Sequence, residues 1–387
     1  MRDRRERIYL NIAFVSHASV LNGAPISLVE LVEELLRKFP ACSASVGFPV
    51  PGPILDKYDL SGADIFFYGS GFGGREILVT RPKIKKNLQR RFEKKRVDLV
   101  IANSLESFRA VQAASELRIP VIWMIHELMT AYRGRRELPD MRSAAQLADR
   151  LVFNSRRSLA LSSELGDGIG EKSGVIYPGV RIPDKIPDRR SVRNELGLEL
   201  EGLLLGSIGD ICPQKGYESL VRAFAIISRS YPSARLLIIG RTPERYREFQ
   251  SRLVDLCREL DLGERVEFAG EKMDLTRWIG ALDLLIHPSW SESFGRVIVE
   301  ALAREVPVVA ARSGGAEEIM ANGETGFLVP VEDPEALAGA AIRMISDQDQ
   351  ARAMAIRGRA EVMERYTIAR TAMELEEEIK RVSPIYS

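Results

Sequence analysis

Two glutamates in one short segment could bind a sugar nucleotide. Glu292 and Glu300 belong to the run His-Pro-Ser-Trp-Ser-Glu-Ser-Phe-Gly-Arg-Val-Ile-Val-Glu at 287–300. The pattern places Glu292 in a loop and Glu300 inside the apolar helix that follows. A loop carboxylate can accept hydrogen bonds from sugar hydroxyls, and the second acid can reach a ribose. A loop acid and a solvated helix acid are also common together, so the pair alone does not define a site.

The start of that helix is a candidate seat for a diphosphate. The first N–H groups of a helix are unpaired and carry positive dipole charge, which attracts anions. Gly295 directly precedes the predicted helix at 296–303. Because glycine has no side chain, a ligand can approach the backbone closely there.

The three histidines of the chain all lie near the ends of predicted strands. His126 and His287 directly follow a strand, and His17 comes one residue later. Parallel sheets place functional groups at these ends, although any one such histidine could be an ordinary turn residue. The three lie on different strands without paired metal-ligand spacing, so they do not indicate a metal site.

The elements that must position these residues alternate between strands and helices. Strands are predicted at 9–15, 45–48, 64–68, 98–102, 120–125, 203–208, 235–239, 265–268, 283–286 and 306–310. Helices are predicted at 26–39, 83–95, 217–230, 246–260, 296–303, 334–345 and 368–381. Nearly continuous apolar strands in this order predict an α/β protein with parallel sheets covered on both faces.

The chain divides near 177–190, a stretch with three prolines and many charges that is typical of a linker. We therefore predict two doubly wound Rossmann-like domains facing each other across a cleft. The first is expected at 1–183 and the second at 184–366. The final segment, 367–387, follows a complete second domain, and its helix is expected to pack back on the first domain.

The amino-acid composition limits which partners and which cellular location are expected. The 387 residues include 55 basic and 54 acidic ones, so the net charge of +1 gives no reason to expect a nucleic-acid partner. Three cysteines, odd in number and far apart, favour a reducing compartment. No apolar run is long enough to span a membrane, and the N-terminus does not have the pattern of a signal peptide. We expect a cytoplasmic protein.

The motifs together resemble glycosyltransferase family four, the retaining, nucleotide-sugar-dependent enzymes of the GT-B fold. The resemblance is strong over about 206–333 and weaker in the first half. In the second half it is carried by the segment 287–300, Ala-Leu-Ala at 301–303, Pro-Val-Val-Ala at 307–310, Gly-Gly at 314–315 with Glu318, Gly-Glu-Thr-Gly-Phe-Leu-Val at 323–329, Pro-Gln-Lys-Gly at 213–216, Phe-Ala-Gly at 268–270 and Tyr-Pro-Gly-Val at 177–180. In the first half it is carried by Asn-Gly-Ala-Pro-Ile-Ser at 22–27, Ile-His-Glu at 125–127 and Phe-Asn-Ser at 153–155.

The resemblance implies roles for individual residues. Glu292 would hold hydroxyls of the donor sugar, Lys215 would neutralise the departing diphosphate, and His126 would lie beside the reacting carbon from the acceptor domain. Substrate-binding residues implied or suggested around them are Gly23, Ala24, Gly209, Arg241, Met273, Ser293, Phe294, Gly295, Arg296 and Glu300. Since a lysine and a helix start can stabilise the diphosphate, neither a metal nor another cofactor is expected.

Three positions depart from the family pattern, and one of them, Glu317 in place of a usual proline, touches no reacting group. Asp210 stands where many members carry an arginine, five residues before the lysine, and a carboxylate would repel a diphosphate. Arg241 or Arg296 could replace the missing cation. Glu305 stands where glycine is frequent, and a left-handed residue other than glycine costs about 1–2 kcal/mol. We therefore expect the preceding helix to end in a different way here.

Two further segments need an interpretation. Gly-Ser-Gly-Phe-Gly-Gly at 69–74 imitates a dinucleotide fingerprint, but no helix start follows it and the expected acid is missing, so a loop is the better prediction. The segment 81–96 contains nine basic residues and one acid, with Leu88 and Phe92 as an apolar element. It could be a solvated helix face, or it could contact an anionic membrane.

The sequence thus predicts a metal-independent, retaining glycosyltransferase of hexosyl type. It would move a sugar from a UDP- or GDP-linked donor to a hydroxyl of a glycan or lipid-linked acceptor, in polysaccharide or glycolipid biosynthesis. Two alternatives remain open at this point. One is a sugar-nucleotide epimerase on the same fold, and the other is a non-catalytic nucleotide-sugar binding protein, which Asp210 favours.

Overall fold

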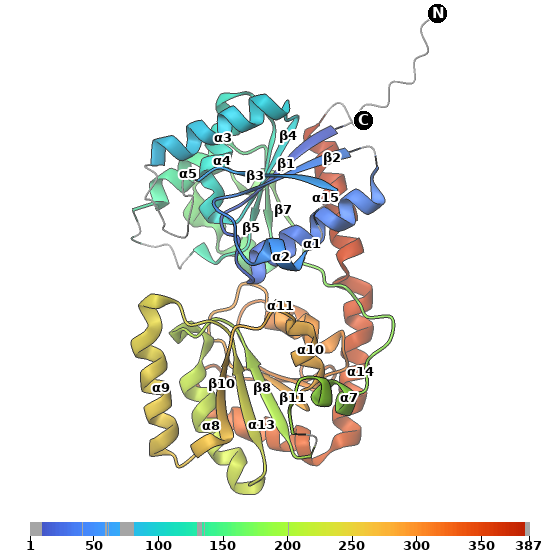
Figure 1. The fold of residues 1–387 in the computed structure, drawn as a ribbon. Coiled ribbons are helices and arrows are strands. Elements are labelled where there is room, and N and C mark those ends of the chain that lie inside the picture. Colours follow the sequence, from blue (N-terminus) through green and yellow to red (C-terminus); the bar gives the residue numbers. More distant parts are fainter. Residues whose placement is uncertain are drawn as a thin grey trace, which may run out of the picture. The chain divides into compact units, whose positions relative to one another are not determined.

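The chain folds into two compact units. The computed structural model describes residues 10–40, 42–58, 60, 62–69, 81–129, 134, 136–199 and 201–383. Unit 1 comprises Met1–Gly179 together with Ile368–Ser387, and unit 2 comprises Val180–Thr367. Each unit is a parallel β-sheet with helices on both faces, so the predicted α/β class with two Rossmann-like domains is confirmed (Figure 1).

Unit 1 is built on a seven-stranded sheet with the order β3-β2-β1-β4-β5-β6-β7. Its strands are β1 (Leu10–Ser16), β2 (Cys42–Phe48), β3 (Ala63–Phe67), β4 (Leu99–Asn103), β5 (Val121–Ile125), β6 (Arg150–Phe153) and β7 (Ser173–Val175). Its α-helices are α1 (Gly23–Lys38), α2 (Ile54–Lys57), α3 (Arg81–Lys95), α4 (Phe108–Glu116), α5 (Leu138–Leu147), α6 (Arg156–Ala160) and α15 (Ile368–Val382).

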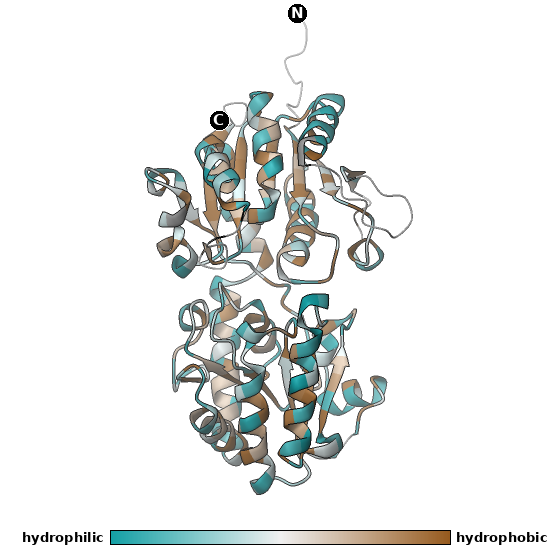
Figure 2. Ribbon diagram, turned by 90° about the vertical axis from the view of Figure 1, so that its left-hand side faces the viewer, coloured by the Kyte–Doolittle hydropathy of each residue, from teal (hydrophilic) through white to brown (hydrophobic). Residues whose placement is uncertain are grey.

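Side chains that alternate in direction along the strands of unit 1 form two apolar cores, one on each face of the sheet. In β1, Ile12 and Phe14 pack with α1 and α15, whereas Ala13 and Val15 pack on the opposite face with α3, α4 and α5. Successive side chains of a strand point to opposite faces, so a continuous apolar strand must be covered on both. In Figure 2 the strands are mostly brown and the outer helices carry teal surface.

Helix α15 follows unit 2 in the sequence but belongs to unit 1, where it packs along α1 and against β5 (Figure 1). The Arg150 guanidinium donates a 2.6 Å hydrogen bond to the Glu378 carboxylate. The Thr371 hydroxyl accepts from the Gly179 N–H at 2.8 Å and donates to the Tyr177 carbonyl at 2.9 Å. The first contact joins α15 to β6, and the Thr371 contacts join α15 to the segment that leaves unit 1.

Unit 2 repeats the arrangement with six strands in the order β10-β9-β8-β11-β12-β13. The strands are β8 (Leu204–Ile208), β9 (Arg235–Ile239), β10 (Val266–Gly270), β11 (Leu284–His287), β12 (Val308–Ala311) and β13 (Phe327–Val329). The α-helices are α7 (Arg189–Glu195), α8 (Tyr217–Ser230), α9 (Arg247–Glu259), α10 (Leu275–Gly280), α11 (Arg296–Leu302), α12 (Ala316–Ile319), α13 (Pro334–Ser346) and α14 (Gln348–Arg365).

Strand order reverses at one place in each sheet, between β1 and β4 in unit 1 and between β8 and β11 in unit 2. In open parallel sheets, ligands bind outside the carboxyl ends of the strands at such a switch point. Asn103 ends β4, Gly209 follows β8 and His287 ends β11. Gly209, which was predicted to bind substrate, thus lies at the switch point of unit 2, together with His287.

Two expectations about local structure are wrong. Glu305 adopts a left-handed conformation, with φ of 53°, so the chain after α11 turns as it would with glycine. Leu88 and Phe92 are each 1% exposed and pack in the core of unit 1, so α3 offers no apolar element to a membrane. The glycine-rich segment 69–74 lies outside the described residues except for Gly69.

Candidate active site

An ion pair between Lys215 and Glu292 lies at the switch point of unit 2. The Lys215 Nζ is 2.6 Å from the Glu292 Oε2, and the two side chains are 25% and 12% exposed. Lys215 comes from the loop between β8 and α8, and Glu292 from the loop between β11 and α11. The structure thus brings together two of the three residues predicted to be catalytic.

Close packing of two loops creates this pair. Gly216 has φ of 68°, and a Cβ atom added to it would lie 2.1 Å from the Pro288 carbonyl oxygen, so a larger residue would push the loops apart. The Trp290 N–H donates to the Gln214 carbonyl at 3.1 Å, and the Trp290 indole donates to the Pro213 carbonyl at 2.9 Å. The loop that carries Lys215 is therefore fastened to the loop that carries Glu292.

His287 is a third member of the cluster that the sequence analysis did not assign to the site. Its side chain is buried, and its Nε2 lies 3.2 Å from the same Oε2 that Lys215 contacts. Two nitrogen atoms therefore converge on one oxygen of Glu292. The sequence did show that His287 is a polar residue at the end of an apolar strand. The spacing of residues alone, however, does not show that the His287 ring contacts Glu292.

The Lys215–Glu292 pair is ionised at neutral pH. Burial alone would raise the pKa of the Glu292 carboxyl, but the charge of Lys215 and the nearby His287 outweigh it and hold that pKa well below its usual range. Burial alone would lower the pKa of Lys215, but the charge of Glu292 and its hydrogen bond raise it. The site therefore holds an ammonium group beside a carboxylate.

Tyr217 is buried next to Gly209, which in turn lies beside Lys215. Its hydroxyl donates a 2.8 Å hydrogen bond to the Gly209 carbonyl, and burial raises its pKa well above the usual value. Gly209 itself has φ of 153°, and a Cβ atom there would lie 3.4 Å from the Lys215 Cε. Gly209 therefore packs against the Lys215 side chain at ordinary van der Waals distance.

The segment before α11 is firmly packed. Phe294 is buried, and its ring lies 5.7 Å from that of Tyr366. A Cβ atom on Gly315 would lie 2.1 Å from the Phe294 carbonyl oxygen, so only glycine allows this approach. Gly295 precedes the helix with φ of 98°, and no side chain caps that helix start. The contacts of Phe294 with Tyr366 and Gly315 thus fix the backbone that follows Glu292.

The two arginines suggested as replacements for the missing cation both face carboxylates. The Arg241 Nε and Nη2 atoms each donate a 3.1 Å hydrogen bond to the Asp210 carboxylate. The Arg296 Nε lies 2.8 Å from the Glu300 Oε1, with both side chains largely buried. The Arg241 side chain is 37% exposed, so it is the more accessible of the two.

The remaining predicted residues of unit 2 are less closely grouped. Ser293 is half-buried between Glu292 and Phe294. Met273 is 48% exposed in the loop between β10 and α10, next to Lys272, whose ammonium lies over the Trp278 ring at 4.4 Å. This exposed loop is separate in sequence from the Lys215–Glu292 cluster.

Unit 1 brings its predicted residues together through Asn103. Gly23 and Ala24 begin α1, and His126 follows β5. The Asn103 side chain reaches both the Ala24 carbonyl, at 3.0 Å, and the His126 Nε2, at 2.7 Å. Asn103, like His287, was not predicted to belong to a site, although it is a polar residue at the end of an apolar strand.

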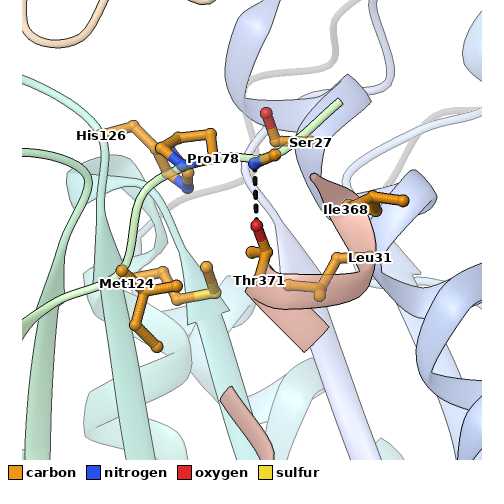
Figure 3. Close-up of a pocket in the computed structure, with 9 residues that line it drawn as sticks. Ser27, Leu31, Met124, His126, Pro178, Ile368 and Thr371 are labelled. Atoms are coloured by element: carbon orange, nitrogen blue, oxygen red, sulfur yellow. Dashed lines mark hydrogen bonds between the residues drawn. The ribbon is translucent and has the colours of Figure 1, made fainter. Parts of the chain in front are cut away.

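His126 also borders a small pocket within unit 1 (Figure 3). His126 and Met124 lie on one side of the pocket, and Leu31 and Ile368 lie on the other. Ser27 and Thr371 contribute hydroxyl groups to its lining. The pocket is thus bordered by α1, the end of β5 and the start of α15.

Two sequence-family models match almost the whole described chain. The model described as Glycosyltransferase Family 4 matches residues 22–182, and the model described as Glycosyl transferases group 1 matches residues 188–361. The first match falls in unit 1 apart from its last three residues, and the second falls in unit 2.

Curated relatives share part of their length with this chain. A D-inositol 3-phosphate glycosyltransferase of Nocardia farcinica is 34% identical over 256 residues, which are 62% of this chain and 56% of the relative. The enzyme of the same name from Corynebacterium efficiens is 32% identical over 282 residues, covering 67% and 65%. The chain thus spans less than two thirds of the length of these relatives.

Solved structures match nearly all of the chain. The Anabaena protein HepE, crystallised with UDP and glucose, superposes with a TM-score of 0.83 at 25% identity, covering 96% of this chain and 100% of HepE. The motifs, the two matched family models and the shared architecture agree with one another. The chain belongs to the family-four glycosyltransferases, enzymes with the GT-B fold.

Proposed function

We propose that the chain is a retaining glycosyltransferase that uses a UDP-sugar and needs no metal ion. The Lys215–Glu292 pair carries this proposal, because it sets a cation for the diphosphate beside a carboxylate for the sugar hydroxyls. HepE was crystallised with UDP and glucose, which supports uracil as the base of the donor. A GDP-sugar is the other donor that the motifs allow.

The residues suit departure of a nucleoside diphosphate. Negative charge accumulates on the leaving phosphate as the glycosidic bond breaks, and fixed cations and N–H groups aimed at it lower the barrier. Lys215 supplies positive charge, Arg241 has guanidinium N–H groups besides the two that contact Asp210, and the uncapped N–H groups at the start of α11 add donors. On donor binding, Lys215 would shift its hydrogen bond from Glu292 to a phosphate oxygen.

Unit 1 would bind the acceptor and contribute His126 to the reaction. The acceptor is a hydroxyl of a glycan or a lipid-linked polyol. Curated relatives are named for D-inositol 3-phosphate, which is a phosphorylated polyol, and this supports an acceptor with many hydroxyl groups. Asp210 no longer favours a non-catalytic binding protein, because Arg241 neutralises its charge.

A thermal-shift panel of nucleoside diphosphates and their sugars tests this function. A ligand that binds only the folded state raises its stability by mass action, by about 2.7 kcal/mol at a hundred times its dissociation constant. We expect UDP and one UDP-sugar to raise the unfolding temperature, and the matched adenosine compounds to have little effect. If no nucleoside diphosphate raises it, the proposed donor class is wrong.

Arg241 is expected to bind the diphosphate from the end of β9. The Arg241→Ala variant should bind UDP about tenfold more weakly, since one charge-assisted hydrogen bond contributes roughly 1.5 kcal/mol. Isothermal titration with UDP measures the change. The matched control is Arg245→Ala, because Arg245 is exposed and lies over the Tyr246 ring. Equal affinity of the Arg241 variant and the wild type would contradict this role.

We also propose that α3 makes peripheral contact with anionic membrane. Its exposed basic residues Lys83, Lys86, Arg90 and Lys94 recur every three or four positions, so they form one stripe along the helix. Among the described residues, none of the four forms an ion pair. With Leu88 and Phe92 buried, the contact would be electrostatic only. No helix in the described part of the chain is long and apolar enough to span a membrane.

Flotation with liposomes tests the α3 stripe. Binding to vesicles with anionic lipid should be salt-sensitive, because each basic residue near the surface contributes about 1 kcal/mol. The double variant Lys86→Gln, Arg90→Gln should float several-fold less. Its matched control, Arg252→Gln with Arg258→Gln on α9, removes the same charge from unit 2. If both double variants float like the wild type, α3 is only a solvated surface.

A further inference from the structure

Asn103 joins two parts of unit 1 that the family pattern singles out. It ends β4, its side chain is fully buried, and both ends of its amide have a partner. The amide nitrogen donates to the Ala24 carbonyl at 3.0 Å, and the amide oxygen lies 2.7 Å from the His126 Nε2. One buried side chain therefore connects the start of α1 with the histidine after β5.

The chemistry of the partners determines which way the amide points. A carbonyl oxygen can only accept, so the group that faces Ala24 must be the NH₂ of Asn103. The amide oxygen then faces His126, and because that oxygen carries no proton, the His126 Nε2 must donate one. A neutral imidazole has a single N–H, so the lone pair of the ring is on Nδ1.

The surroundings hold this arrangement in place. The Asn154 side chain donates to the His126 carbonyl at 2.9 Å, and the His126 N–H donates to the Glu127 carboxylate at 3.2 Å. The Glu127 carboxylate also accepts from the Leu105 N–H at 3.0 Å. Asn103 and His126 are thus fixed relative to each other by contacts on both strand ends.

Backbone strain next to Asn103 points to a function for this geometry. Ser104 has φ of 81° although it is not glycine, and its hydroxyl donates to Glu127. Such a conformation costs about 1–3 kcal/mol and persists where the surrounding structure imposes it, typically at functional sites.

We propose that Asn103 is a positioning residue that holds His126 in the Nε2–H tautomer. In that state the neutral ring meets a hydroxyl group of a sugar or polyol as a hydrogen-bond acceptor through Nδ1. Assigning this ligand to His126 rests on the proposed function. The fixed tautomer depends only on the contacts within unit 1.

Nuclear magnetic resonance of imidazole nitrogens tests the tautomer directly. The full chain has three histidines, so protein labelled with ¹⁵N-histidine gives three ring systems, and His126→Gln identifies the one that disappears. We expect the long-range ¹H–¹⁵N pattern of an Nε2–H ring for His126 in the wild type. An Nδ1–H pattern, or an average of the two tautomers, would overturn the proposal.

Two variants distinguish the contact of Asn103 with the His126 ring from the contact of Asn154 with the His126 backbone. Asn103→Ala should give a mixture of tautomers at His126, whereas Asn154→Ala, which removes a contact to the His126 backbone and one to the Ser158 hydroxyl but none to Asn103, should keep the Nε2–H pattern. Turnover of Asn103→Ala should fall by about tenfold to a hundredfold with unchanged UDP affinity, because misplaced reacting groups react more slowly. An unchanged His126 spectrum in Asn103→Ala would contradict the proposal.

The same experiments distinguish failure of the inference from failure of the proposed function. If His126→Gln retains full turnover while the wild-type ring shows the Nε2–H pattern, then Asn103 positions His126 as described and the function assigned to His126 is wrong. If His126→Gln loses turnover but the ring shows the Nδ1–H pattern, the function stands and the role of Asn103 is wrong.

Discussion

Replacing Glu292 with glutamine is expected to lower turnover about a thousandfold. The substitution keeps the size of the side chain and removes its charge, so the donor sugar loses the carboxylate that accepts from its hydroxyls. Lys215 and His287 both approach Oε2, and in the variant the group they meet is a neutral amide. The diphosphate contacts from Arg241 and the start of α11 remain, so binding of UDP alone should change little.

Turnover and UDP affinity must be measured on the same preparations of Glu292→Gln. Circular dichroism at the assay temperature shows whether the variant is folded. The matched control is Glu335→Gln, because Glu335 is an exposed acid on α13 of the same unit. We expect the control to behave as the wild type does. If Glu292→Gln loses activity only in proportion to its loss of folded protein, Glu292 has a structural role.

Replacing Lys215 with methionine should weaken UDP binding about a hundredfold, since a cation in a partly buried site is lost. It should also lower stability, because breaking a buried ion pair leaves one charge without compensation. In the wild type, Glu292 has a lowered pKa, so its stabilising contribution is present above the unfolded pKa of about 4.3 and is lost as the pH falls further.

Urea unfolding of unit 2 at pH 7 and below pH 4 measures the second effect of Lys215→Met. The wild type should be more stable at pH 7, and this difference should shrink in the variant, where burial favours the protonated Glu292. Lys185→Met is the matched control, because Lys185 is exposed in the segment that precedes α7. An identical pH dependence in the wild type and Lys215→Met would show that the pair contributes nothing to folding.

Much of the architecture could be predicted because apolar patterns decide which segments are buried. The strands around the two switch points, β1, β4, β8 and β11, lie within about two residues of their predicted ranges. β7 and β13 have three residues each and were not predicted as strands. Such short segments carry too few residues to establish a period, and their position follows from the neighbouring strand.

The site was predictable only in part because its contacts join distant loops. Motif similarity named Lys215 and Glu292, but the approach of Gly216 to Pro288, which brings the pair together, is a property of the folded loops. The missing arginine at Asp210 was evident in the sequence. That Arg241 pairs with Asp210 depends on β8 and β9 being neighbours in the sheet, which spacing does not reveal.

His287 and Asn103 were not predicted for the same reason, because their contacts also join distant parts of the chain. Each is a polar residue at the end of an apolar strand, and this signal is shared by many turn residues without a function. Their partners, Glu292 for His287 and both Ala24 and His126 for Asn103, come from other elements of the same unit. Only the topology shows that these groups meet.

A crystal structure of the chain with a bound UDP-sugar would test the central claim most directly. We predict that a diphosphate oxygen lies within hydrogen-bonding distance of the Lys215 Nζ and that sugar hydroxyls lie within hydrogen-bonding distance of the Glu292 carboxylate. The Lys215–Glu292 contact of 2.6 Å should be longer in that complex. A nucleotide bound away from these residues, with the ion pair unchanged, would contradict the account.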